Sequence, residues 1–261
     1  MKITIVGAGK VGSQLGRKLF AVEHDLVQVF SRSMEKAETL AKELGADFTN
    51  DLNRITAGAD LYLLAVPDDA IRDVATYFAH YKFQEKLVAH TSGATPITVL
   101  TGQDIERCGV FYPLQSFSLG KEPDFSQIPF CIDAKRPDDL VLLKNLGAQL
   151  SPKVFEINDH QRAVLHIAAV FANNFSNHLF HIAYQLLEKE GLSFDLLLPL
   201  IRETVEKLET AAPAAMQTGP AVRGDEETIE RHLRYLKSYP IYQEIYQRLT
   251  ESIQAPGHQV T

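Results

Sequence analysis

The sequence predicts an α/β fold, a doubly wound and mostly parallel sheet, followed by an all-α C-terminal domain. Three observations support this prediction. Short β-branched apolar runs alternate with amphipathic helical stretches up to residue 156, a glycine-rich turn joins the first run to the first helical stretch, and no strand pattern recurs in residues 157–261. Strands that alternate with helices pair in parallel through right-handed crossovers, which place helices on both faces of the sheet.

The elements of the first part follow one another regularly. Lys2–Val6 is predicted as a buried strand, and a helix through Phe20 follows the glycine turn. Further strands are predicted at Leu26–Phe30, Ala46–Phe48, Leu61–Val66, Lys86–Ala89, Cys108–Phe111, Pro129–Asp133 and Lys153–Glu156. A helix is predicted over Met34–Leu44, and Asp68 or Asp69 is expected to cap another that follows Pro67.

Residues 157–261 show helical periodicity only. Ala163–Glu190 is predicted as one long helix that ends at Gly191, a residue suited to the left-handed conformation of a helix C-terminus. Shorter helices are predicted at Phe194–Glu209, Asp225–Tyr235 and Tyr239–Ile253. The change of pattern predicts two domains, 1–156 and 157–261.

Composition excludes several classes of protein. The net charge is −7 and the basic residues are interspersed with acidic ones, unlike the basic surface of a nucleic-acid-binding protein. The longest apolar runs, such as residues 61–66, are too short to span a bilayer. Cys108 and Cys131 lie in apolar segments, so buried thiols are expected rather than a disulfide or a metal pair. We therefore expect a cytoplasmic protein without membrane or nucleic-acid partners.

The turn after the first strand has the spacing of a dinucleotide-binding Rossmann turn. Gly7 permits the tight turn, Gly9 lets a pyrophosphate approach the backbone, and Gly12 lets the helix pack closely on the sheet. The first helical residues, Lys10 and Val11, add free backbone amides, and the helix dipole favours the phosphates. Residues 1–156 are therefore predicted to bind a dinucleotide.

The end of the second strand distinguishes NADP from NAD. An NAD site places a carboxylate about 20 residues after the glycines, whereas this chain has Ser31-Arg32-Ser33. Arg32 can stack on adenine and pair with a 2′-phosphate, and Ser31 and Ser33 can add hydrogen bonds. The cofactor is therefore predicted to be NADP. The alternative is that Arg32 is a solvated surface residue beside a helix-capping serine.

Two further loops follow strands at the edge where ligands bind in such sheets. One contains Val66 and Pro67, and the other contains His90 and Ser92. We expect these four residues to lie near the nicotinamide half of the cofactor. Either loop could instead cap a helix without touching a ligand, which is the interpretation we favour for Asp68.

Motifs spread over nearly the whole chain resemble known families. The first half resembles the family of pyrroline-5-carboxylate reductase, ketopantoate reductase and the β-hydroxyacid dehydrogenases, which join a Rossmann domain to a helical domain. The chain is more similar to a family of bacterial Rossmann-like proteins whose C-terminal half has no known function. The motifs are Gly7–Gly12, His90-Thr91-Ser92-Gly93, Tyr112-Pro113-Leu114-Gln115-Ser116-Phe117, Asn173-Asn174-Phe175 and Thr218-Gly219-Pro220-Ala221-Val222-Arg223-Gly224-Asp225.

Hydride transfer needs a protein group that protonates or polarises the substrate heteroatom. The β-hydroxyacid dehydrogenases place Lys and Asn one turn apart on a helix of the second domain, whereas no lysine lies between Ala163 and Leu187 here. His166, Asn173 and Asn177 share one face of the predicted helix. We predict His166 as the proton donor, Asn173 as the partner of the substrate oxygen and Asn177 as a substrate contact. Alternatively, these side chains hydrogen-bond to neighbouring helices.

The loop with Gly219 and Arg223 resembles in position the Ser-Pro-Gly-Gly-Thr loop that holds the substrate carboxylate in pyrroline-5-carboxylate reductase. Arg223 and the backbone amide of Gly219 suit a carboxylate or phosphate. The alternative is a tight turn with a surface arginine. His178 and His181 have no third ligand nearby in the sequence, so no metal site is predicted.

These features predict an NADP(H)-dependent oxidoreductase for a small carbonyl or imine substrate, with an anionic substrate as one option. The alternative is a non-catalytic NADP-binding sensor or scaffold, which the missing lysine and Tyr112 favour, because the family usually has histidine at position 112. A deazaflavin-dependent oxidoreductase, a description given to some relatives by analogy, is a weaker alternative. Residues 157–261 are predicted to bind substrate and to form a homodimer, because stretches such as 167–172 are apolar on more than one face.

Overall fold

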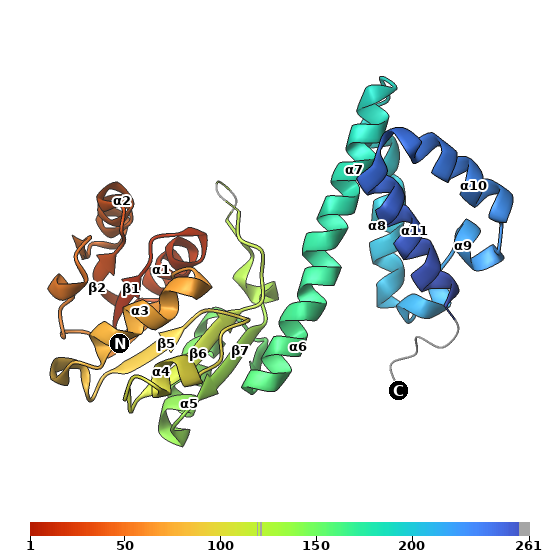
Figure 1. Ribbon diagram of the computed structural model, residues 1–261. Coiled ribbons are helices and arrows are strands. Elements are labelled where there is room, and N and C mark those ends of the chain that lie inside the picture. The colour runs from red at the N-terminus through yellow and green to blue at the C-terminus, as the bar shows by residue number, and fades with distance from the viewer. Residues whose placement is uncertain (119, 121, 256–261) are drawn as a thin grey trace. The chain divides into compact units, whose positions relative to one another are not determined.

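A computed structural model describes residues 1–118, 120 and 122–255 of the chain. The chain divides into two units, Met1–Val170 and Phe171–Thr261, each described by itself below (Figure 1). The sequence pattern predicted a boundary at residue 156. Contacts between α6 (Asp159–Ala169) and the loop that follows strand β5 (Leu87–His90) place this helix in the first unit.

An eight-stranded sheet organises the first unit. The strands lie in the order β3-β2-β1-β4-β5-β6-β7-β8, and all neighbours pair in parallel except β6 and β7. The other strands are β1 (Lys2–Val6), β2 (Asp25–Phe30), β3 (Asp47–Thr49), β4 (Leu61–Leu64), β6 (Cys108–Pro113), β7 (Phe130–Ala134) and β8 (Val154–Glu156). The predicted doubly wound, mostly parallel sheet is confirmed, and each strand lies within a few residues of its predicted position.

The antiparallel pair β6–β7 has a simple cause. A parallel pair needs a crossover connection, usually a helix, that returns the chain to the starting edge of the sheet. Among the described residues that connect β6 to β7, the only helix is the short 3-10 helix Phe125–Gln127. The chain therefore enters β7 from the edge at which it left β6.

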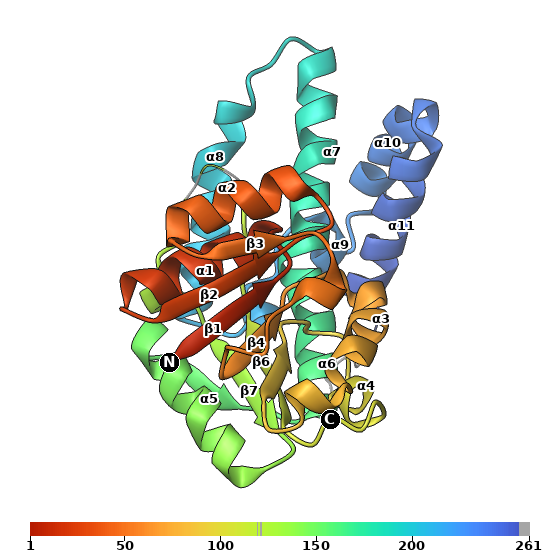
Figure 2. The ribbon, with the colours of Figure 1, turned by 90° about the vertical axis from the view of Figure 1, so that its left-hand side faces the viewer.

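Helices cover both faces of the sheet, as Figure 2 shows. The long helices α1 (Lys10–Ala21), α2 (Met34–Leu44) and α5 (Pro137–Leu150) pack against one face through an apolar cluster that includes Ile3 and Ile5 of β1. The helices α3 (Asp68–Phe78) and α4 (Thr98–Thr101) pack with the next residue of that strand, Val6, on the other face. Alternate strand residues therefore serve two cores, as the pleat of a strand requires.

The N-terminus of α3 differs from the prediction. Pro67 is the N-cap residue, and neither Asp68 nor Asp69 caps the helix through a side-chain hydrogen bond; both lie inside its first turn. Carboxylates in that position are stabilised by the positive end of the helix dipole. The predicted capping interaction was therefore wrong.

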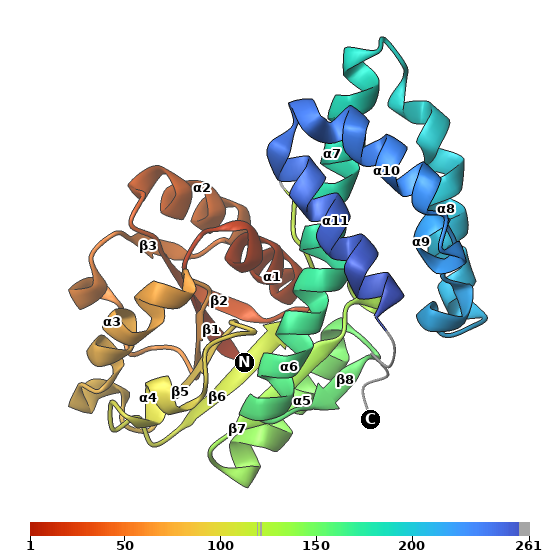
Figure 3. The ribbon, with the colours of Figure 1, turned by 45° about the vertical axis from the view of Figure 1, so that its right-hand side comes forward.

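The second unit is helical (Figure 3). A π-helix (Val170–Phe175) begins at the last residue of the first unit. The α-helices that follow among the described residues are α7 (Ser176–Lys189), α8 (Leu198–Glu206), α9 (Pro220–Arg223), α10 (Glu226–Tyr235) and α11 (Pro240–Gln254). Gly191 follows α7 with a φ of +69°, as predicted. The one long helix predicted over residues 163–190 is interrupted by the π-helix, which hydrogen-bonds from i to i+5. No helix among the described residues is long and apolar enough to cross a membrane.

Candidate functional site

The glycine turn between β1 and α1 fits tightly against the end of β4. Gly7 has a φ of +120°, and a Cβ there would lie 2.4 Å from the carbonyl oxygen of Ala65. A Cβ on Gly12 would lie 1.8 Å from the carbonyl oxygen of Gly7. Gly9, the N-cap residue of α1, faces open space instead. The turn therefore leaves the first helical amides accessible beside a backbone that a phosphate can approach.

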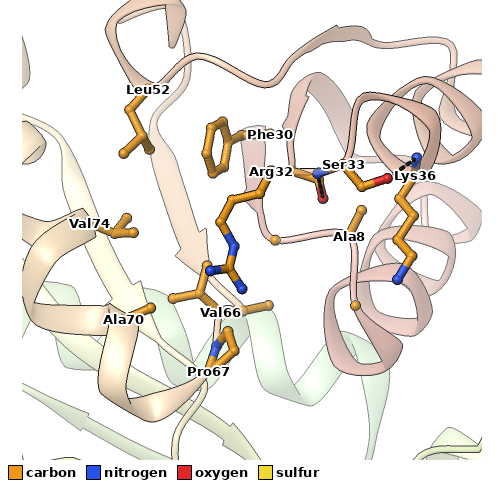
Figure 4. A pocket seen from close by; sticks show the side chains of 14 residues that line it. Ala8, Phe30, Arg32, Ser33, Lys36, Leu52, Val66, Pro67, Ala70 and Val74 are labelled. Carbon is orange, nitrogen blue, oxygen red and sulfur yellow. Dashed lines mark hydrogen bonds between the residues drawn. The ribbon is translucent and has the colours of Figure 1, made fainter.

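A pocket of about 380 Å³ opens beside this turn (Figure 4). It is bounded by the glycine turn, the end of β2, the start of α2 and the segment from β4 into α3. Its lining residues are Gly7, Ala8, Gly9, Phe30, Ser31, Arg32, Ser33, Lys36, Leu52, Ala65, Val66, Pro67, Ala70 and Val74. The predicted residues Gly7, Gly9, Ser31, Arg32, Ser33, Val66 and Pro67 thus lie around one pocket.

One side of this pocket is basic and the other apolar. The Ser33 side chain accepts a hydrogen bond from the Lys36 amide at 3.4 Å and so caps α2, while the Ser31 hydroxyl accepts one from the Ser33 amide at 3.3 Å. Arg32 extends toward the side formed by Val66 and Pro67. None of the described lining residues carries a carboxylate. The pocket therefore suits an aromatic base and an anionic group together.

Lys36 was not predicted as a site residue. It lies in the first turn of α2, three residues after the capping Ser33, and this spacing brings it to the same rim as Arg32. A basic residue in the first turn of a helix is unfavourable toward the helix dipole. The unfavourable position of this lysine was the feature of the sequence that could have identified Lys36 as a site residue. Leu52, Ala70 and Val74, on the apolar side, carried no comparable signal.

Five predicted cofactor residues do not line the pocket. Lys10 and Val11 open α1, with Lys10 exposed, and Gly12 is buried under the turn. The backbone of Lys10 and Val11 remains beside the turn. Ser92 is buried, and its hydroxyl accepts hydrogen bonds from the Ala94 and Thr95 amides. Their contacts with a cofactor, and those of His90, stay predictions.

His90 is fully buried at the end of β5. Its Nδ1 accepts a hydrogen bond from the Ser92 amide at 3.3 Å. Burial, followed by the nearby positive charge of Arg162, lowers the pKa of His90 from 6.5 to about 3. The imidazole is therefore neutral at physiological pH, and its hydrogen bond from the Ser92 amide stabilises the loop after β5.

A second cluster of polar groups lies at the ends of β5 and β6. The hydroxyl oxygen of Tyr112, near the end of β6, is 3.5 Å from Nδ1 of His166 on α6. Gly93 lies directly against both: a Cβ there would be 2.6 Å from Tyr112 Cζ and 2.7 Å from His166 Nδ1. Burial raises the pKa of Tyr112 to about 12. The structure thus pairs the predicted proton donor, His166, with Tyr112.

A buried arginine holds α6 in place one turn before His166. Arg162 is 1% exposed, and its Nη2 donates to the Thr95 carbonyl at 2.7 Å and to the Asp159 carboxylate at 2.5 Å. Asp159 in turn accepts a hydrogen bond from the Ile97 amide at 2.9 Å. Arg162 therefore joins α6 to the loop after β5, which carries Gly93. Sequence reasoning missed it, because an arginine on a helix is ordinarily exposed.

The remaining predicted residues lie in the second unit. Asn173, on the π-helix, and Asn177, on α7, are both exposed. The spacing argument that joined them to His166 assumed a regular α-helix, so it does not extend across the π-helix. Gly219 has a φ of +108°, and the exposed Arg223 lies 3.9 Å from the Asp225 carboxylate. The substrate roles of these residues stay predictions.

Cys108 and Cys131 are buried free thiols, as predicted. Among the residues that the structure describes, no group of three or more His, Cys, Asp or Glu side chains is arranged to hold a metal ion.

Comparisons with known proteins agree with this architecture. Residues 1–114 match the Rossmann-like domain, and residues 128–253 match the domain of unknown function DUF2520. The chain is 40% identical to a Bacteroides fragilis protein named provisionally as an NADP oxidoreductase, with a TM-score of 0.90 over 97% of both chains. None of the curated proteins compared with the chain matches it.

More distant structures share the fold. A pyrroline-5-carboxylate reductase from Coxiella burnetii is 17% identical, with a TM-score of 0.60 over 97% of this chain and 95% of its own. An imine reductase from Myxococcus stipitatus, solved with NADP⁺, is 15% identical, with a TM-score of 0.66 over 97% of this chain and 93% of its own. The chain therefore belongs to the family of Rossmann-like proteins whose helical C-terminal part is the domain of unknown function DUF2520.

Proposed function

We propose that the chain is an NADP(H)-dependent oxidoreductase that acts on small carbonyl or imine compounds, anionic ones among them. The observation that carries the proposal is the pocket in which the glycine turn faces a basic rim of Arg32, Ser33 and Lys36. The names of the Bacteroides fragilis protein and of the imine reductase solved with NADP⁺ support the same class of reaction. The residues that line the pocket fit NADP(H): the basic rim suits its 2′-phosphate, and the open backbone at Gly9 suits its pyrophosphate.

A reduced nicotinamide, when bound, supplies the hydride, and the protein must supply the proton. The paired side chains of Tyr112 and His166 are the proton source in this proposal, since they meet at the carboxyl edge of the parallel strands, where ligands bind. Asn173, Asn177, Gly219 and Arg223 of the second unit stay sequence-based predictions of substrate contacts, and the proposal does not depend on them.

Turnover tests the proposal. Purified protein with NADPH or NADP⁺ is offered 2-oxoacids, β-hydroxyacids and cyclic imines, and the absorbance of NADPH is followed. We expect consumption or formation of NADPH with at least one compound class. Tight NADPH binding without turnover of any compound would favour the non-catalytic sensor, the alternative suggested by the missing helix lysine and by Tyr112.

Replacing Arg32 with alanine is expected to weaken NADPH binding by about 30- to 150-fold and NADH binding by less than about threefold. The basis is the loss of a hydrogen-bonded ion pair of about 2–3 kcal/mol that only the 2′-phosphate can form. Lys36→Ala is expected to act in the same direction with a smaller effect. Kd values from NADPH and NADH fluorescence measure both.

The control for these variants is Lys42→Ala, which removes an exposed lysine from the last turn of the same helix. It is expected to leave both Kd values unchanged. Equal losses of NADPH and NADH affinity in Arg32→Ala would refute the assignment of the 2′-phosphate to this rim.

We also propose that the second unit forms a homodimer. Among its described residues only Ala221 and Leu236 are buried apolar side chains. Large apolar side chains are exposed instead, among them Phe171, Phe175, Leu179, Tyr184, Leu196, Leu200, Val205, Leu208, Ile241, Leu249 and Ile253. An apolar surface of this kind marks an interface in a water-soluble chain, and a second copy presents the same apolar residues in return.

Light scattering at micromolar concentration is expected to give twice the mass of one chain. Leu196→Glu combined with Leu200→Glu is expected to shift the protein toward the monomer, because it places charges on two strongly exposed apolar positions. Glu203→Gln, on the helix α8 that carries Leu200, is the control and should leave the mass unchanged. A monomeric wild-type protein would contradict the proposal.

A further inference from the structure

A glycine, a tyrosine and a histidine from separate elements meet at one point of the first unit. Gly93 comes from the loop after β5, Tyr112 from the end of β6 and His166 from α6. A Cβ at position 93 would lie 2.8 Å from the Tyr112 hydroxyl oxygen and 2.7 Å from His166 Nδ1. Only a residue without a side chain lets the hydroxyl and the imidazole come together there.

This point lies on the ligand-binding edge of the sheet. β4, β5 and β6 are parallel, so their carboxyl ends share one edge with the glycine turn after β1. The negative charge of Asp68, which directly follows the pocket residue Pro67, acts on the Tyr112 hydroxyl.

We propose that Tyr112 is a catalytic residue that donates the proton to the substrate heteroatom, and that His166 is the positioning residue that restores this proton. This inference rests on the proposed function. The C=O or C=N carbon accepts the hydride and its electron pair, and the π electrons move to the heteroatom. The heteroatom takes the proton from Tyr112 Oη as that O–H bond breaks. Tyr112 then regains a proton through His166, which receives one from water.

The surroundings suit a neutral phenol in this role. Burial, and then the neighbouring Cys131 and Asp68, keep the Tyr112 pKa near 12, so the donor stays protonated throughout the physiological range. The positive charge of Arg162 acts in the opposite sense and stabilises the phenolate at the moment it forms. His166 Nδ1 lies 3.5 Å from the Tyr112 hydroxyl oxygen, and in the proposal this ring nitrogen returns the proton to the phenol.

Kinetics with the compound most rapidly turned over test the assignment. Tyr112→Phe is expected to lower kcat by about 10²- to 10³-fold, the size of a lost general acid. NADPH affinity should stay within about twofold of the wild type. Tyr77→Phe, which alters an exposed tyrosine of α3, is the control and should leave kcat unchanged. His166→Ala should lose activity that free imidazole partly restores, whereas imidazole should not restore Tyr112→Phe.

A measurement without turnover supplies the second test. Tyrosine labelled with ¹³C at Cζ gives one resonance for each ring, and Tyr112→Phe identifies that of Tyr112. His166→Gln is expected to shift this resonance without any cofactor, and saturating NADP⁺ should shift it again. The resonance of Tyr62, whose hydroxyl is bound to the Thr56 carbonyl, should stay in place.

Each failure has its own signature. Full activity in Tyr112→Phe, or a Tyr112 resonance that responds to neither His166→Gln nor NADP⁺, would overturn the assignment of Tyr112. Loss of activity in His166→Ala alone would return the donor role to His166. A protein that binds neither NADPH nor NADP⁺ would refute the proposed function, while the response of Tyr112 to His166→Gln would still test the pair.

Discussion

Gly12→Ala is expected to destabilise the protein by about 3 kcal/mol and to weaken NADPH binding by about 100-fold. The added Cβ would lie 1.8 Å from the carbonyl oxygen of Gly7, far inside van der Waals contact, and 3.1 Å from the Ala65 side chain. Helix α1 cannot move freely to relieve this clash, because Leu15 and Leu19 are fully buried in the core. Overpacking of this kind carries the stability cost, and a displaced helix loses one or two hydrogen bonds to the phosphates.

Gly9→Ala separates the binding effect from the stability effect. Its Cβ would meet no atom of the protein within 4 Å, and its φ of −83° suits any residue. The free energy of unfolding should therefore change by less than about 1 kcal/mol. The methyl group would nevertheless occupy the space through which a pyrophosphate approaches the turn.

Urea unfolding and NADPH titration measure the two effects. Gly58→Ala, whose Cβ would make only ordinary contacts, is the control and should change neither quantity by much. Unchanged NADPH affinity in Gly9→Ala would show that the phosphates bind elsewhere.

Acid is expected to destabilise the protein through His90. Its pKa is about 3 in the folded state and near 6.5 when unfolded, so the unfolded chain binds the extra proton between these values. Stability from this residue is complete above pH 6.5 and falls as the pH falls toward 3. The loss amounts to about 3 kcal/mol by about pH 4.5.

His90→Asn tests this directly. The Asn side-chain oxygen can accept the hydrogen bond that the Ser92 amide now gives to Nδ1, but it cannot be protonated in this range. The unfolding free energy of the variant should fall less steeply between about pH 6.5 and 4.5, by up to about 1.4 kcal/mol per pH unit. His181→Asn, at an exposed position of α7, should retain the wild-type slope. Identical slopes in wild type and His90→Asn would contradict the expected linkage.

The sequence predicted the fold well because its signals are local. Apolar runs such as Leu61–Leu64 are buried on both sides and bounded by turn residues, so strand positions can be identified without knowing their neighbours. The antiparallel β6–β7 pair is different, since its direction depends on the path of a connection without a long helix. The π-helix carries no residue pattern that distinguishes it from regular helix.

The site was predicted less completely because its residues meet only after folding. Gly7 and Arg32 belong to local motifs, and both line the pocket. Tyr112 and His166 are 54 positions apart, and no periodicity connects a strand residue with a helix residue over that distance. Arg162 was missed for a related reason, since one of its two hydrogen-bond acceptors is the carbonyl of Thr95, which is distant in the sequence.

The close contact at Gly93 makes the residues that are allowed at positions 93, 112 and 166 depend on one another. A methyl group at 93 is incompatible with the present places of Tyr112 and His166, because it would come within 2.8 Å of both side chains. Substitutions at these positions therefore have non-additive effects, as is common for residues in direct contact. Room for alanine at 93 requires that both the side chain at 112 and the side chain at 166 be smaller or displaced, because each lies within 2.8 Å of the added Cβ. The residue found at 93 should accordingly covary with the residues found at 112 and 166.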